Sequence, residues 1–340
     1  MSRPKNILFI SHYFYPHIGG VEKHIYEVSK KLLKHNCRVT VITEKYHQEL
    51  LDVEYLEGIR ILRFEFLKKR FLGLFDTWYK LYVNREYIRE ADIVHVHDVF
   101  IWYLPLRMLF FRKPIFATFH GWEGVYPIPF KNKFVRKLSV FLSKGNICVG
   151  EYIKKYYDIS SDFISYGGVN APNVTTPKIE KSIVFVGRLA KDVGLQTLLE
   201  VCDLLKTYNV EFCGDGDFRN ECSKRGKVLG FVKPDKYLSK SLICFASGYL
   251  SILEGLANKC LVVAVFDNPL RRDYILLSPF KRWLIYGDNP GVISESIKNH
   301  LKESQLQRTI KESFAFAKSQ TWQNVSDLYL QLWKNYNSLN

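Results

Sequence analysis

One histidine stands where an enzyme could use it. His120 follows the apolar run Ile115–Phe119 and precedes Gly121, which leaves room for a substrate beside the imidazole. A histidine at the end of a strand can donate a hydrogen bond to a sugar or move a proton. The alternative is a histidine of a surface loop, without a chemical role.

More polar side chains flank this position. His95 and His97 alternate along the run DIVHVH, Asp98 follows it, and Glu123 comes shortly after His120. Two histidines on one face beside a single acid form only a loose metal-binding pattern, so we expect no bound metal. We expect packed or hydrogen-bonded side chains that line a cleft, among them those of His97, Asp98 and Glu123.

Residues suited to a phosphate occur in both halves of the chain. Gly19 and Gly20 lie between an apolar run and a helix-period segment, where backbone N–H groups and the helix dipole favour an anion. A tight turn that needs glycine is the alternative. In the second half, Arg188 ends the run SIVFVGR. Its guanidinium could hold a diphosphate through two charge-assisted bonds, and Lys191 is near enough to help.

Two further loops of the second half follow apolar runs. Gly214 begins the sequence GDGD, which again predicts a glycine loop at a strand end. Leu250 and Ser251 lead into a helix-period segment, and Glu254 falls early in it. A carboxylate there could accept hydrogen bonds from ribose hydroxyls. The alternative is an acid of the first turn that stabilises the helix dipole.

Short apolar runs of β-forming residues alternate along the chain with segments that have apolar residues at helical spacing. The strands and helices that they predict would position these residues. This β-α-β rhythm predicts parallel sheets covered by helices on both faces. Two doubly wound domains place ligands at the carboxyl ends of their strands, facing a shared crevice. The turn-rich segment Tyr166–Asn173 separates the halves, so we predict domains over 1–168 and 169–319 and a closing helix over 320–340. The predicted strands are 7–11, 38–43, 59–64, 92–97, 114–119, 147–150, 182–187, 210–213, 242–245 and 261–266.

The net charge of +15 is concentrated in places. Lys131–Lys144 interleaves basic and apolar residues without an acid, and Lys68–Phe75 is similar. Such a face suits an anionic membrane surface. A solvated rim around a core helix is the alternative. No recognised binding motif accompanies the charge, so we expect no nucleic-acid partner.

Composition also bears on the compartment. No apolar run is long enough to span a membrane, and the seven cysteines are scattered without a C-x-x-C pair. Most of them lie in apolar runs, which predicts buried free thiols in a reducing environment. We therefore expect a cytoplasmic protein, either free or peripheral on the inner face of the cell membrane.

Seven short motifs occur in an order that resembles family 4 of the retaining glycosyltransferases. The resemblance covers nearly the whole chain. It implies a GT-B fold, with two Rossmann-like domains that face a cleft and a last helix, beginning near Gln320, that packs on the N-terminal domain. The motifs are GGVE (19–22), HVHD (95–98), HG (120–121), VGRL (186–189), GDGD (214–217), SILE (251–254) and LVVA (261–264).

The resemblance implies transfer of a hexose from a UDP- or GDP-linked sugar to an acceptor. The basic, aromatic-rich stretches Lys131–Lys144 and Lys68–Phe75 favour a lipid-linked acceptor, with a glycan as the alternative. The C-terminal domain would bind the nucleotide-sugar and the N-terminal domain the acceptor, with His97, Asp98 and Glu123 on the acceptor side and without a metal or another cofactor. Arg188 would hold the diphosphate, Gly20 would approach it across the cleft, and Glu254 would bind the ribose. His120 would contact the transferred sugar near the reacting carbon. The anomeric configuration would be retained without a protein nucleophile.

Two positions depart from the family pattern. Val193 stands where the family has a lysine after the arginine, and Ala246 stands where it has the first of two glutamates. These departures leave open a catalytically impaired nucleotide-sugar-binding protein. A GT-B-type nucleotide-sugar epimerase is another alternative, although no convincing carboxylate pair is present. A nicotinamide-dependent oxidoreductase is a third, since Glu44 ends the second strand, but Gly19-Gly20 is not G-x-G-x-x-G.

Overall fold

The computed structural model describes residues 5–69, 72–172, 176–302 and 306–337. Arg70 and Phe71 of the second basic stretch, and Asn173 of the predicted linker, lie outside these residues. The chain divides into two compact units. The N-terminal unit consists of Met1–Ser165 with Trp322–Asn340, and the C-terminal unit of Tyr166–Thr321.

The N-terminal unit is built on one sheet with the strand order β3-β4-β2-β1-β5-β6-β7-β8. Its apolar runs form parallel strands because a sheet covered on both faces buries every side chain of its central strands. One pairing differs from the expected parallel pattern: β3, only four residues long, runs antiparallel to β4 in a short hairpin that was not predicted. The strands are β1 Asn6–Ser11, β2 Arg38–Glu44, β3 Val53–Leu56, β4 Ile59–Phe64, β5 Ile93–His97, β6 Ile115–Phe119, β7 Asn146–Val149 and β8 Phe163–Ser165.

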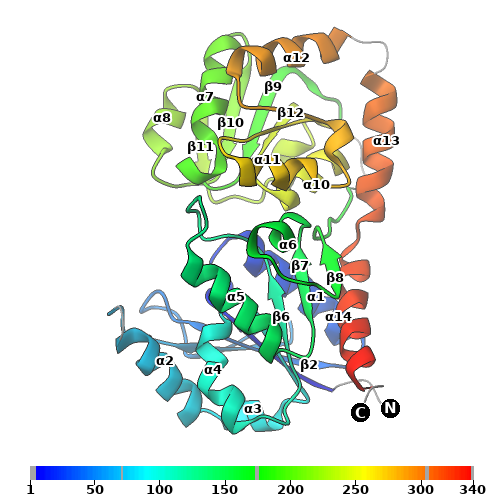
Figure 1. The fold of residues 1–340 in the computed structure, drawn as a ribbon. Helices are drawn as coiled ribbons and strands as arrows, with labels where there is room; N and C mark the ends of the chain where they lie inside the picture. The colour runs from blue at the N-terminus through cyan, green and yellow to red at the C-terminus, as the bar shows by residue number, and fades with distance from the viewer. Residues whose placement is uncertain (1–4, 70–71, 173–175, 303–305, 338–340) are drawn as a thin grey trace. The chain divides into compact units, whose positions relative to one another are not determined.

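Helices cover this sheet in two groups. Figure 1 shows α2, α4 and α5 side by side, and the last helix, α14, beside α1. The chain thus leaves the N-terminal unit at Ser165 and returns to it at Trp322. The helices are α1 Gly20–Lys34, α2 Leu72–Val83, α3 Glu86–Glu90, α4 Phe100–Leu109, α5 Phe130–Leu142, α6 Tyr152–Tyr157 and α14 Trp322–Asn337.

A chain of buried hydrogen bonds ties α14 to the sheet. Trp333 Nε1 donates to His95 Nδ1 at 3.2 Å, so the neutral imidazole carries its proton on Nε2 and donates to Thr118 Oγ1 at 2.8 Å. Thr118 Oγ1 lies 2.9 Å from Tyr329 Oη, which lies 2.9 Å from His24 Nε2. Because tryptophan can only donate, the whole chain is consistently polarised from Trp333 to His24.

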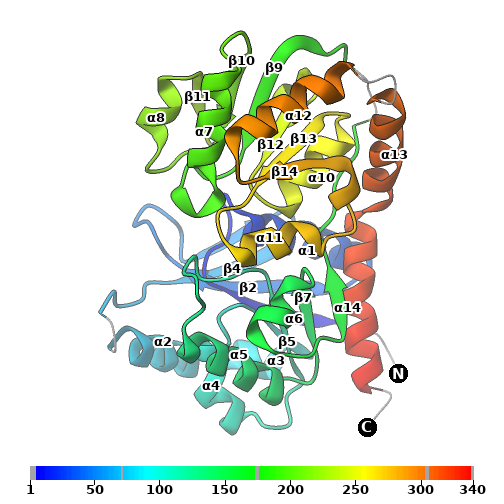
Figure 2. The ribbon, with the colours of Figure 1, turned by 45° about the horizontal axis from the view of Figure 1, so that its top comes forward.

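The C-terminal unit has a parallel sheet with the order β11-β10-β9-β12-β13-β14 (Figure 2). Its strands are β9 Ile179–Val186, β10 Asn209–Cys213, β11 Lys227–Gly230, β12 Ser241–Ala246, β13 Leu261–Val265 and β14 Leu284–Gly287. Its α-helices are α7 Leu195–Leu204, α8 Arg219–Ser223, α9 Asp235–Leu238, α10 Tyr249–Ala257, α11 Pro269–Leu276, α12 Pro290–Lys302 and α13 Leu306–Ser319, with 3-10 turns at Lys191–Val193 and Lys281–Trp283.

The cysteines fulfil the expectation drawn from their apolar surroundings. All seven are buried free thiols. Burial raises the pKa of Cys148 and of Cys222 to about 11, so these groups are neutral at physiological pH. They act as small apolar side chains of the two cores.

Candidate active site

The structure brings His120 and His97 into direct contact. His97 is the last residue of β5 and His120 directly follows β6, and these strands are parallel neighbours. His97 Nδ1 lies 2.9 Å from His120 Nε2, and the two rings are stacked with centroids 5.2 Å apart. Two residues that are 23 positions apart therefore form one pair at the carboxyl edge of the sheet.

The pair is uncharged. Burial holds the pKa of both His97 and His120 well below the usual value, and the neighbouring His24 lowers it further. His97 Nε2 is buried without a partner. A buried lone pair costs less than a buried N–H, which favours the tautomer in which His97 Nδ1–H donates to His120 Nε2. We infer that His120 then carries its proton on Nδ1 and can donate one hydrogen bond to a substrate.

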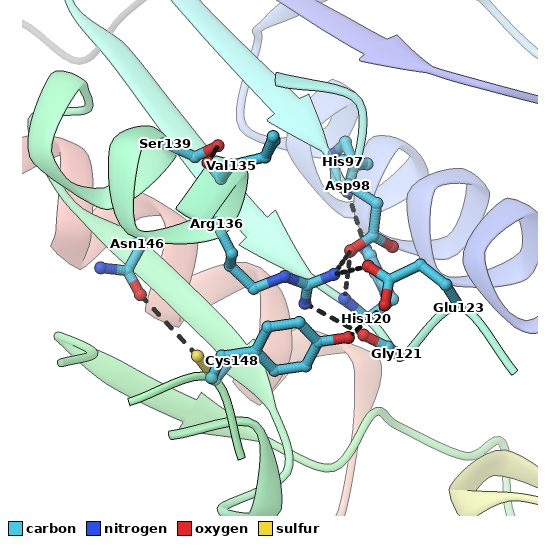
Figure 3. A network of polar contacts seen from close by, with 11 residues as sticks. His97, Asp98, His120, Gly121, Glu123, Val135, Arg136, Ser139, Asn146 and Cys148 are labelled. Atoms are coloured by element: carbon cyan, nitrogen blue, oxygen red, sulfur yellow. Dashed lines mark hydrogen bonds and ion pairs between the residues drawn. The ribbon is translucent and has the colours of Figure 1, made fainter. Parts of the chain in front are cut away.

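A second network lies beside this pair and holds the loop after β6 (Figure 3). Asp98 Oδ1 accepts a hydrogen bond from the backbone N–H of His120 at 3.0 Å. Arg136 Nη2 lies 3.6 Å from that carboxylate and 3.3 Å from Glu123 Oε1, and Arg136 Nη1 donates to the Gly121 carbonyl at 3.0 Å. Partial burial raises the pKa of Asp98 to about 6, although Arg136 opposes the shift.

This network corrects one expectation about the basic stretch Lys131–Lys144. Arg136 does not belong to its solvent-facing side: the residue is buried, and its guanidinium lies over the rings of Phe119 and Tyr157. Along α5, Arg136 and Ser139 share the buried face at a spacing of three residues. The same network makes Glu123 a support of the loop, because its second oxygen accepts a hydrogen bond from Tyr157 Oη at 2.6 Å.

Gly19 and Gly20 stand at the N-terminus of α1, where a carboxylate already lies. Glu22, in the first turn, is buried and lies 2.7 Å from His17 Nδ1. A Cβ atom on Gly19 would come within 2.3 Å of Glu22 Oε2, the end of a flexible side chain that can move aside. A carboxylate at the helix N-terminus is stabilised by the dipole, but it repels a phosphate unless His17 is protonated. The phosphate-binding role of Gly19 and Gly20 stays a prediction.

A polar aromatic cluster at the ends of β1 and β2 escaped the sequence reasoning. His12 Nε2 lies 2.8 Å from Glu44 Oε2, and the rings of His12 and His17 both stack on Tyr13, with centroids 4.1 and 4.5 Å away. The signal was present as HYFYPH after the first strand. Rings with carboxylates behind them can stack on a sugar and accept hydrogen bonds from its hydroxyls.

In the C-terminal unit, Arg188 lies in the loop that leaves β9. Its side chain is 63% exposed and donates from Nη2 to Asp192 Oδ2 at 2.7 Å. An exposed pair of this kind is weak, so a diphosphate could displace Asp192 from the guanidinium. Lys191 is exposed at the start of the following 3-10 turn, while Val193 at its end is buried.

Close backbone approach explains the glycine after β10. Gly214 lies against the end of β9, where a Cβ atom would stand 1.8 Å from the carbonyl oxygen of Gly187. Leu189 N–H donates to the Asp215 carbonyl at 2.9 Å, so the loop that carries Arg188 is bound to the GDGD loop. Gly214 is therefore buried and acts by allowing this contact.

The loop before α10 is shaped by Ser251. Its hydroxyl accepts hydrogen bonds from the N–H groups of Ser247 and Gly248, both at 3.1 Å. Leu250 and Ser251 stand in the first turn of α10, and Glu254 follows one turn later, half-buried. Backbone amides at the start of a nine-residue helix suit an anion. The roles of these three residues toward a nucleotide-sugar stay predictions.

The structure thus groups the predicted residues at two strand edges. His97, Asp98, His120 and Glu123 meet at the edge of the N-terminal sheet. Arg188 and Gly214 meet at the carboxyl ends of β9 and β10, and Ser247 Oγ, at the end of β12, donates to the Val186 carbonyl. Over the residues that the structure describes, no group of three or more His, Cys, Asp or Glu side chains could hold a metal ion.

The model of Glycosyltransferase Family 4 matches residues 18–158. An uncharacterized glycosyltransferase of Methanocaldococcus jannaschii is 23% identical over 335 residues, 91% of this chain and 93% of that protein. The GPI3 subunit of phosphatidylinositol N-acetylglucosaminyltransferase of Saccharomyces cerevisiae is 30% identical over 289 residues, 72% of this chain. The chain spans 62% of that subunit's length.

Solved structures show the same architecture. Sucrose-phosphate synthase from Thermosynechococcus elongatus aligns with a TM-score of 0.78 at 15% identity, over 99% of this chain and 100% of that one. This likeness establishes the GT-B fold predicted from the motifs. The family model and the named glycosyltransferase relatives agree with it, and they do not favour the epimerase alternative. Residues 18–158 therefore match Glycosyltransferase Family 4, and the protein is a glycosyltransferase.

Proposed function

We propose that the protein moves a hexose, with retention of configuration, from a UDP- or GDP-linked sugar to a lipid-linked acceptor at the inner face of a membrane. The observation that carries the donor part is the exposed Arg188 guanidinium, on a loop bound to the GDGD loop at the carboxyl ends of β9 and β10. Ligands of doubly wound sheets bind at that edge. The His97–His120 pair would meet the sugar without a metal or another cofactor.

The reaction can be tested directly. The protein is incubated with UDP- and GDP-linked hexoses and with vesicles that contain phosphatidylinositol, and the lipids are analysed by mass spectrometry. Because the yeast relative is named for N-acetylglucosamine and phosphatidylinositol, UDP-N-acetylglucosamine belongs in the same series. A lipid heavier by one sugar is expected. Transfer to soluble glycans alone would overturn the lipid acceptor, and proton NMR of the product's anomeric centre would test retention.

Arg188→Ala is expected to weaken the binding of a nucleoside diphosphate roughly ten- to a hundredfold, because a charge-assisted hydrogen bond contributes about 1.5–3 kcal/mol. Titration calorimetry with UDP and GDP measures the change. Lys191→Ala tests the neighbouring cation, and Arg308→Ala, in which an exposed arginine of α13 paired with Glu312 is lost, is the matched control. Equal affinity in Arg188→Ala and the parent would remove Arg188 from the donor site.

The membrane part of the proposal rests on an exposed apolar face of the N-terminal unit, which we call the α2-α4-α5 face. On α5, Phe130, Phe134, Lys137 and Phe141 recur at helical spacing opposite the buried Arg136. Phe130 and Phe141 are each 82% exposed. Aromatic side chains on one side of a helix, with lysines among them, are typical of helices that lie in the interface of a bilayer.

The two neighbouring helices extend this face. Helix α2 lies against α4, and α4 lies against α5 (Figure 1). The exposed apolar side chains of these two helices and their flanks are Leu67, Leu72, Phe75, Tyr79, Tyr82, Val83, Met108, Leu109 and Phe111. Exposed basic side chains on the helices of this face or their flanks are Lys68, Lys69, Arg112 and Lys131. An exposed apolar patch with basic neighbours favours an anionic lipid surface over a neutral partner. In the described part of the chain, no helix could span a membrane.

Replacing Phe130, Phe134 and Phe141 together with serine is expected to lower the affinity for anionic vesicles roughly a hundredfold, because each inserted ring contributes about 1 kcal/mol or more. Sedimentation with phosphatidylcholine vesicles, with and without phosphatidylglycerol, measures binding at low and high salt. Binding by the parent should fall as salt rises, since screening acts over about 8 Å at physiological ionic strength.

The control for this experiment is Tyr55→Ser, which changes an exposed ring on β3, outside the α2-α4-α5 face. It should leave vesicle binding unchanged. Lys133→Glu with Lys137→Glu should remove the preference for phosphatidylglycerol. A parent protein that ignores anionic vesicles even at low salt would make the face a solvated rim or a protein-binding surface.

A further inference from the structure

One buried guanidinium links the two segments in which this chain departs from the family pattern. Arg271 lies in α11 and is 6% exposed. Its Nη2 donates to the Val193 carbonyl at 3.2 Å, and both Nη atoms lie 3.4 Å from the Ser247 carbonyl. Val193 replaces the usual lysine, and Ser247 directly follows Ala246, which replaces the usual glutamate.

The charge of Arg271 is not balanced within the C-terminal unit. Across the described residues, its hydrogen-bond acceptors are backbone carbonyls and no ion pair joins it to a carboxylate, while its Nε is buried without a partner. The Tyr274 ring lies 5.3 Å from the guanidinium, and burial raises the pKa of its hydroxyl to about 12, so Tyr274 is neutral. A buried cation without a counter-charge is unfavourable. An anion bound beside it would relieve that cost.

The same helix also organises the start of α10. Tyr274 Oη accepts a hydrogen bond from the Tyr249 N–H at 2.6 Å, and the two rings stack with centroids 3.9 Å apart. Arg271 and Tyr274 are three residues apart on α11, and both reach the segment between β12 and α10. Helix α11 therefore fixes that segment, and Arg271 adds the only link from it to the Lys191–Val193 turn that the described hydrogen bonds contain.

We propose that Arg271 is a positioning residue for the diphosphate of the donor. It joins the turn after Arg188 to the start of α10. Its buried guanidinium also supplies a second positive charge for the diphosphate, in place of the lysine that Val193 replaces. This inference rests on the proposed function, since it takes the two loops as the donor subsite. A charge that acts through a low-dielectric interior should favour ligands in proportion to their negative charge.

The test compares ligands that differ in charge. Uridine, UMP and UDP, and the corresponding guanosine series, are titrated by calorimetry into the parent, Arg271→Met and Arg272→Met. Arg272, the next residue on α11, is exposed and is the matched control. Arg271→Met should weaken diphosphate binding roughly ten- to a hundredfold and monophosphate binding less, with the nucleoside within about twofold. Arg272→Met should bind all three like the parent.

Each other outcome has a defined meaning. An equal loss for all three ligands would make Arg271 a purely structural residue, and no loss would also overturn the inference while leaving the donor site intact. A parent that binds neither UDP nor GDP would overturn the proposed function itself. Arg271→Lys keeps the positive charge and replaces Arg271→Met in the test if the methionine variant does not fold. It should keep the diphosphate-over-nucleoside preference within about threefold, and loss of that preference in the folded lysine variant would refute the role of charge.

Discussion

Replacing His120 with alanine is expected to lower the turnover number by about 10²–10⁴-fold, the usual range for a positioned proton donor or acceptor. The affinity for the nucleoside diphosphate should stay within about a factor of three, because the imidazole would act mainly in the transition state. Steady-state transfer assays and titration calorimetry on the same preparation measure the two quantities. Unchanged turnover would relegate His120 to a structural loop.

His97 provides a graded version of this test. His97→Phe keeps a ring of similar shape in the stack but removes the hydrogen bond to His120 Nε2. Loss of one neutral hydrogen bond should lower turnover roughly two- to tenfold, and the double variant with His120→Ala should be no slower than His120→Ala alone. His47→Ala is the control, since His47 is an exposed loop histidine with a carboxylate, Glu49, 3.9 Å away.

The second large effect is expected at Arg136. Arg136→Ala should lower the free energy of unfolding by about 2–4 kcal/mol, because it removes a large buried side chain and leaves the partly exposed Asp98 and Glu123 carboxylates without their cation. The variant also removes the contacts to the Phe119 and Tyr157 rings and the hydrogen bond to the Gly121 carbonyl. Urea unfolding followed by circular dichroism measures the loss.

A variant of the neighbouring Lys137 tests whether burial, and not charge alone, makes Arg136 important for stability. Lys137→Ala removes a cation one position away on α5, where the side chain is exposed and paired with the exposed Asp158. Its urea midpoint should equal that of the parent, since exposed pairs contribute little. If Arg136→Ala were no less stable than Lys137→Ala, the network of Arg136 with Asp98 and Glu123 would not support the loop that carries His120.

Parts of the fold followed from local sequence because local physics decides them. The run 59–64 was predicted as a strand with the bounds that β4 has, and 38–43 differs from β2 by one residue. Central strands of a parallel sheet are buried on both faces, so they read as continuous apolar runs. The hairpin strand β3 and the strands β8, β11 and β14 are only three or four residues long, too short for a clear run, and were missed.

In the candidate site, too, some features follow from local sequence and others depend on the tertiary fold. Sequence alone marked His120, because a histidine between a strand and a glycine is a local pattern. It did not pair His120 with His97, nor His12 with Glu44, since those contacts depend on which strands become neighbours. The faces of α5 were equally hidden: the interleaved basic and apolar residues suggested one basic surface, whereas helix packing turned Arg136 inward and left Phe130 and Phe141 outward.

By itself the sequence determined the two α/β halves, the positions of the strand-end loops and, through the order of short motifs, the glycosyltransferase family. These features depend on contacts within a few residues, where spacing and residue type suffice. Tertiary structure alone decided the partners of buried polar groups. Tyr329 reaches His24 across 305 positions, and Arg271 reaches Val193 across 78. A buried polar atom takes whichever partner the packing brings within about 3 Å, and sequence spacing does not encode that distance.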